Sequence, residues 1–105
     1  MLASDALAKA AIHVDYPQLQ QLCDQYHVAS LGVFGSVAQG TIRETSDIDL
    51  LVHFKEPVSL LRFIDFEYRL AELFSRPIDL VTPNALSPYI ADQVMRDLQV
   101  LYESS

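Results

Sequence analysis

The residues best suited to chemistry are two aspartates separated by a single residue, Asp47 and Asp49. Residues two apart in a strand point to the same face, and like charges held so close repel unless a cation lies between them. Mg²⁺ prefers such oxygen ligands and often shares them with substrate phosphates. The pair therefore predicts a magnesium site at the start of a buried strand. Two solvated surface aspartates are the simpler alternative.

A third carboxylate, Asp79, stands inside the apolar stretch Ile78–Val81. Charged residues are seldom placed in such a strand without a partner. If this strand pairs beside the strand that carries Asp49, Asp79 faces the same site. A local ion pair with Arg76 or with a helix charge is the alternative.

The three glycines of the chain, Gly32, Gly35 and Gly40, all lie within nine residues of one another. Glycine lets the backbone approach a ligand closely or adopt a positive φ. Ser36 follows Gly35 at the expected start of a helical turn, where free N–H groups and the helix dipole favour an anion. We expect a phosphate-binding turn here, with an ordinary turn and helix cap as the alternative.

Apolar periodicity and capping residues predict the elements that position these side chains. Asp15 is the expected cap of the first helix, and Ser87-Pro88 opens the last. The alternation of helices and strands predicts an α/β or α+β domain built on a small sheet. The expected helices are 17–27, 58–74 and 88–97, with a short helical piece at 37–39 before a polar loop at 40–46; the expected strands are 31–34, 48–54, 78–81 and 100–102.

The helix expected over 58–74 is more apolar than one sheet face requires. Its charged residues are spaced three, four and three apart, which predicts one ion-paired stripe facing water. One sheet face buries about half of a helix. The surplus of apolar residues predicts a second contact, with another helix or another chain. The stripe consists of Arg62, Asp65, Arg69 and Glu72.

Length and composition limit the class of protein. A chain of 105 residues suits one domain, 1–105. Seven basic against fourteen acidic residues, a net charge of -7, argue against a broad nucleic-acid surface and suit a basic protein partner or divalent cations. Cys23 is the only cysteine, and from the apolar pattern we expect neither a membrane-spanning stretch nor a signal peptide. We expect a cytoplasmic protein without membrane contact.

These residues together resemble a known family. Gly35-Ser36, ten residues and then Asp47-x-Asp49 are similar to the signature of the DNA polymerase beta-like nucleotidyltransferase superfamily. The resemblance runs from about Pro17 to Glu103, and the length of the chain and its closing strand most resemble the minimal nucleotidyltransferase (MNT) subfamily. The fold implied is the nucleotidyltransferase fold, a small mixed β-sheet packed against helices. The flanking segments that also match are Leu31–Phe34, Leu50–Val52 and Pro77–Val81.

The resemblance implies a role for each residue of the motif. Gly35 and Ser36 would hold the terminal phosphates of a nucleoside triphosphate, expected to be ATP. Asp47 and Asp49 would bind one or two Mg²⁺ ions, while Asp79 would ligate the second ion or accept the proton of the attacking hydroxyl. All three aspartates are thus the expected catalytic and metal-binding residues.

The resemblance also implies a partner. Many MNT members are encoded beside a HEPN-domain ribonuclease toxin and act as antitoxins, some by adenylylating the toxin. We therefore expect a magnesium-dependent transfer of AMP from ATP to a hydroxyl of a HEPN toxin. The apolar surplus leaves a homo-oligomer open as well.

One departure from the family pattern supports an alternative function. The family often has arginines just after Gly-Ser, where this chain has Val37 and Gln39, so Arg43 in the following loop is the expected basic group for the phosphates. The alternative is a catalytically weak module that neutralises its partner by stoichiometric contact. A third hypothesis is a small-molecule transferase resembling those that adenylylate aminoglycosides, which usually need an additional acceptor-binding domain.

Overall fold

The computed structural model describes residues 12–35 and 47–104 of the chain. Helices and strands alternate along it, and no helix within these two ranges is long and apolar enough to span a bilayer. The elements in chain order are α2 (Tyr16–Gln25), β1 (Val28–Phe34), β2 (Ile48–Phe54), α4 (Leu60–Phe74), β3 (Ile78–Val81), the 3-10 helix η1 (Pro83–Ala85), α5 (Pro88–Asp97) and β4 (Gln99–Glu103).

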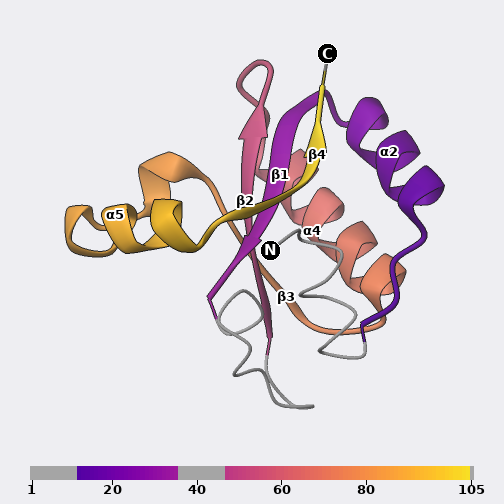
Figure 1. Ribbon diagram of the computed structural model, residues 1–105. Helices are drawn as coiled ribbons and strands as arrows, with labels where there is room; N and C mark the ends of the chain where they lie inside the picture. The colour runs from indigo at the N-terminus through magenta and orange to yellow at the C-terminus, as the bar shows by residue number, and fades with distance from the viewer. Residues whose placement is uncertain (1–11, 36–46, 105) are drawn as a thin grey trace.

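The strands form one mixed sheet in the order β3-β2-β1-β4. β1 runs antiparallel to both β2 and β4, whereas β3 runs parallel to β2, to which α4 connects it. Figure 1 shows α2 and α4 on one side of the sheet and α5 on the other. The small mixed sheet packed against helices, as the sequence predicted, is confirmed.

Local chemistry sets where the elements begin and end. Asp15 caps α2 by accepting a hydrogen bond of 3.1 Å from the Gln18 amide, as expected. His27 has a φ of 56°, a left-handed conformation that no helix continues, so α2 ends before it and β1 begins at Val28. The first strand therefore starts three residues earlier than predicted. Ser59 caps α4, which begins two residues later than predicted.

The main core lies between the sheet and the pair α2 and α4. Phe66 of α4 is fully buried at its centre, with its ring 5.0 Å from that of Tyr26 and 5.8 Å from that of Phe54, centroid to centroid. Aromatic pairs at such distances stabilise a core beyond the area that they bury. The strand residues that face this core are Val28, Leu31, Val33, Ile48, Leu50, Val52 and Leu80.

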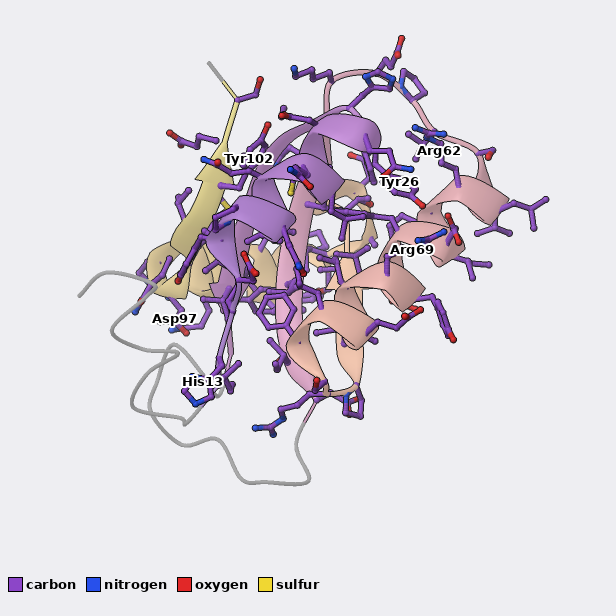
Figure 2. All side chains as sticks on the ribbon, turned by 90° about the vertical axis from the view of Figure 1, so that its right-hand side faces the viewer. His13, Tyr26, Arg62, Arg69, Asp97 and Tyr102 are labelled. Atoms are coloured by element: carbon purple, nitrogen blue, oxygen red, sulfur yellow. The ribbon has the colours of Figure 1, made fainter. Side chains whose placement is uncertain are left out.

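The charged stripe of α4 is exposed and contains an ion pair, as predicted, and it also contacts α2. The Arg62 guanidinium lies 4.8 Å from the centre of the Tyr26 ring and donates a 2.7 Å hydrogen bond to the Gln25 carbonyl. The Tyr26 hydroxyl donates to Asp65, which forms a 3.9 Å ion pair with Arg69. Figure 2 shows Tyr26 and Arg62 side by side where α2 and α4 meet. The stripe therefore joins the two helices.

Candidate active site

Asp49 and Asp79 are brought together by the parallel pairing of β2 with β3. The register places Asp49 directly opposite Asp79, and Ile48 opposite Ile78. Because side chains alternate along a strand, the two carboxylates lie on the sheet face turned away from α2 and α4. Asp49 is half-buried, and Asp79 is exposed on the edge strand. The expectation that Asp79 lies beside the strand of Asp49 is confirmed.

This crowding changes the acidity of Asp49. Burial raises the pKa of its carboxyl to about 6, helped by the Asp79 charge, by a hydrogen bond with Asp79 and by the Asp47 charge. Neighbouring like charges favour the neutral form, and a shared hydrogen bond needs one of the two carboxyls protonated. A divalent cation between them would supply the missing positive charge.

Gly35 is the residue that leaves room for this pair. It follows Phe34, which pairs with Asp49 across β1 and β2, and its φ is 71°. A Cβ on Gly35 would collide with Oδ2 of Asp49. Sequence reasoning gave Gly35 a phosphate-binding role and missed this contact. The signal that could have found it was a glycine ending one strand where a motif carboxylate begins the next.

The donor set fits Mg²⁺ in chemistry. Asp47 lies just before β2 and is exposed, and its charge acts on Asp49. Two carboxylates with a third nearby are the hard oxygen ligands that Mg²⁺ shares with phosphates. In residues 12–35 and 47–104, no three side chains of the His, Cys, Asp and Glu types converge as a metal site. Ser36, Arg43 and the expected helical piece 37–39 lie outside the described residues.

A groove of about 840 Å³ lies at the opposite end of β2. It begins at Val52 and His53, three and four residues along the strand from Asp49, and is bounded by the start of α4 and by η1. Its walls are mostly apolar, and it brings no cluster of carboxylates together. The volume alone therefore does not make it the catalytic site, and the carboxylate pair is the better candidate.

The other reactive side chains belong to the framework. Cys23 is fully buried, and burial raises the pKa of its thiol to about 12, so it is an unreactive core residue. His53 lies 3.2 Å from the Ser30 hydroxyl in an exposed cross-strand pair. No carboxylate completes this pair into a catalytic triad among the contacts of the described segments.

Comparison with known proteins agrees with this geometry. The Nucleotidyltransferase domain family matches residues 18–101. Protein adenylyltransferase MntA of Thermococcus cleftensis is 40% identical over 79 residues, which cover 75% of this chain and 80% of that protein. A solved structure provisionally described as a minimal nucleotidyltransferase has a TM-score of 0.70 at 33% identity, covering 93% of this chain and 94% of its own.

A more distant structure shares the fold. It is the complex of a tri-AMPylated HEPN toxin of Shewanella oneidensis with an MNT antitoxin, with a TM-score of 0.62 and 19% identity over 85% of this chain and 70% of that one. The family match covers most of the chain, and the strands of the chain present paired carboxylates on one face of the sheet. The chain is a member of the nucleotidyltransferase domain family and an enzyme of that class.

Proposed function

We propose that this chain transfers AMP from ATP to a hydroxyl group of a partner protein, a HEPN-domain toxin, and thereby acts as its antitoxin. The observation that carries the proposal is the Asp49–Asp79 pair, with Gly35 packed against it. The similarity to an adenylyltransferase and to an MNT antitoxin supports the choice of nucleotide and partner. The proposed compartment is the cytoplasm, which supplies ATP.

The proposed roles combine the sequence motif with the geometry of the described carboxylates. Asp47 and Asp49 would hold one or two Mg²⁺ ions, which would supply positive charge to the triphosphate and to the departing pyrophosphate. Gly35 and Ser36 bind the phosphates through backbone and hydroxyl donors, and Arg43 adds a positive charge. Asp79 stands exposed at the sheet edge, within reach of a docking partner.

The proposed transfer forms one bond to phosphorus and breaks another. The acceptor oxygen attacks the α-phosphorus of ATP, and the bond from that phosphorus to the bridging oxygen of the β-phosphate breaks. Asp79 would take the proton of the acceptor hydroxyl, or, if it held a metal ion instead, the departing pyrophosphate would carry that proton away. The products are an AMP ester on the partner and pyrophosphate.

The second candidate is a module that neutralises its partner by binding alone. Two observations favour it. The three aspartates form no converged three-ligand set in the described part of the chain, and Val37 and Gln39 stand where the family often has arginine. The two candidates differ in whether neutralisation depends on the carboxylates.

Intact-mass spectrometry of the partner, after incubation with ATP and Mg²⁺, tests the choice. Asp79→Asn keeps the shape of the side chain and removes its charge, so the rate of AMP transfer should fall at least about a hundredfold, the lower scale for a lost general base. Association with the partner should persist. Asp92→Asn makes the same chemical change on exposed α5 and serves as the matched control, with full transfer expected.

The opposite result identifies the binding module. If the partner gains no mass with any nucleotide, yet the native chain and Asp79→Asn both neutralise it fully, the chain does not act by AMP transfer. A mass increase that persists unchanged in Asp79→Asn would instead contradict the role given to that carboxylate.

A further inference from the structure

The outer side of α4 carries an apolar stripe that nothing in the described chain covers. We use the name apolar stripe for Leu60, Leu61, Ile64 and Tyr68, which are 73%, 81%, 50% and 63% exposed. Their spacing places them within about one third of the helix circumference. The charged residues that contact α2 occupy a separate face, so the apolar stripe lies on the side of α4 away from α2. Figure 2 looks directly onto these two helices.

The exposed area is close to what a dimer requires. At roughly 150–200 Å² for a fully exposed large side chain, the four residues expose about 400–500 Å² of mainly apolar surface. A standard interface buries about 800 Å² per partner, about 65% of it apolar in homodimers, which is about 500 Å². The apolar stripe thus supplies nearly the whole apolar part of one subunit's share.

The spacing within the stripe is symmetric. Leu60, Ile64 and Tyr68 follow one another at intervals of four residues, so Ile64 is the midpoint of the set. A two-fold axis through the midpoint makes an antiparallel copy of the helix present the same residues in reverse order. Leu60 of one copy then meets Tyr68 of the other, and Ile64 meets Ile64. The stripe is therefore complementary to itself.

Local charge also favours a second copy at this face. Two chains of net charge -7 repel each other. Beside the apolar stripe, however, Arg62 and Arg69 balance Asp65 and Glu72. Glu67, the remaining acid of α4, is half-buried and accepts a 3.1 Å hydrogen bond from the Leu80 amide of β3. The outer side of α4 is thus locally neutral.

We propose that the apolar stripe binds the apolar stripe of a second copy of this chain, with the two α4 helices antiparallel about a two-fold axis at Ile64. The groove at the end of β2 contributes, because Leu60 is one of its lining residues. Tyr68 of the second copy lies over Leu60, at the mouth of this groove, as an aromatic anchor in a pocket. Asp49 and Asp79 lie on the opposite face of the sheet, so both catalytic sites stay open. The dimer does not depend on the proposed AMP transfer.

Sedimentation velocity of the full chain, between roughly 1 and 100 µM, tests for the dimer. The native chain should form a species of twice 11.8 kDa. Leu61→Glu places two charges in the interface and should raise the dissociation constant at least about a hundredfold. Its circular dichroism should not change, because Leu61 is 81% exposed. Tyr89→Glu is the matched control, since Tyr89 is 95% exposed on α5, and it should stay dimeric.

Oxidative cross-linking locates the two-fold axis. Buried Cys23 does not interfere, so a single introduced cysteine reports on its own position. Ile64→Cys should give a disulfide-linked dimer, because facing residues at the axis lie within the distance of about 7 Å that a disulfide can bridge. Leu60→Cys should not form this disulfide, since the two copies of residue 60 lie about 12 Å apart, measured along the helices.

Several outcomes would overturn the proposal. A native chain that stays monomeric over the whole concentration range excludes the second copy. If Leu61→Glu dimerises as the native chain does, the apolar stripe is not the interface. The same follows if Tyr89→Glu raises the dissociation constant as much as Leu61→Glu does. Cross-linking through Leu60→Cys rather than Ile64→Cys excludes the two-fold axis. If the native chain is monomeric, and its AMP acceptor binds the native chain but not Leu61→Glu, then the apolar stripe binds the acceptor instead.

Discussion

Side chains alternate between the two faces of β2, and the two faces have opposite effects on stability. On one face, Ile48, Leu50 and Val52 are fully buried against α2 and α4. On the other, Asp49 and exposed His53 flank Leu51, and Asp49 lies beside a second carboxylate. The helix-side face removes apolar area from water, which stabilises the fold. The open face holds like charges together, which opposes folding until a cation arrives.

The comparison shows how so small an enzyme can carry a strained electrostatic site. Every other residue of this strand is anchored in the core, and this anchoring fixes the positions of the residues between them. The helix-side face therefore sets stability, and the open face sets chemistry. Substitutions on the two faces should separate these two properties.

The largest expected effect lies in the core that covers the helix-side face of β2. Phe66→Ala removes a fully buried ring that contacts the rings of Tyr26 and Phe54. The free energy of unfolding should fall by about 3–5 kcal/mol, a large part of the stability of a domain of this size. Urea denaturation measures it, and Phe66→Leu should lose clearly less because it leaves a smaller cavity. A loss below about 1 kcal/mol would mean that this cluster does not anchor the sheet.

A smaller effect is expected from Gly35→Ala, which acts on the open face. The added Cβ collides with the Asp49 carboxylate, and alanine disfavours the φ of 71°. The displaced carboxylate should lower the rate of AMP transfer about a hundredfold, since an ångström of misplacement has effects of this order. Single-turnover transfer of labelled AMP measures it.

Gly32→Ala is the control for that experiment. Its Cβ would meet the Leu98 side chain at 2.6 Å and the Gln99 carbonyl at 3.1 Å, and no carboxylate is among these contacts. This variant should lose stability but keep the AMP-transfer rate of its folded fraction. Equal rates for Gly35→Ala and Gly32→Ala would show that Gly35 does not position Asp49.

Features set by neighbouring residues were predictable from the sequence. Ile78–Val81 and the span of β2 follow from apolar runs, and α5 follows from the Ser87 cap and Pro88. The start of β1 was not predictable, because His27 turns the chain at a positive φ without the glycine that usually signals such a turn. The contact of the charged stripe with Tyr26 depends on where α2 packs, which no local pattern contains.

The candidate site also has some features that were predictable from the sequence and others that were not. Its residue types and their spacing were visible in the sequence, since Asp47, Asp49 and Asp79 stand out among apolar neighbours. The raised pKa of Asp49 and its contact with Gly35 arise from strand pairing and burial, so only the fold supplies them. The roles of Ser36 and Arg43 stay predictions.

The smallest expected effect tests the electrostatic strain itself. The Asp49 pKa is raised from 3.8 to about 6 in the fold, so the folded state binds this proton more tightly than the unfolded state does. The resulting stability is fully present below about pH 4 and is lost as the pH rises through about 6. Asp49→Asn cannot ionise and should keep that stability. Because Asp49 is only half-buried, we expect a gain of about 1 kcal/mol over the native chain at pH 8 without metal.

Urea denaturation in the presence of EDTA measures this gain at pH 5 and pH 8, with Asp92→Asn as an exposed control that should gain nothing. Added Mg²⁺ should then stabilise the native chain at pH 8, because a ligand that binds only the folded state raises its stability. It should have much less effect on Asp49→Asn, which lacks the carboxylate. If Asp49→Asn and the native chain unfold alike at both pH values, and Mg²⁺ changes neither, then the two carboxylates are solvated separately and the open face is not strained.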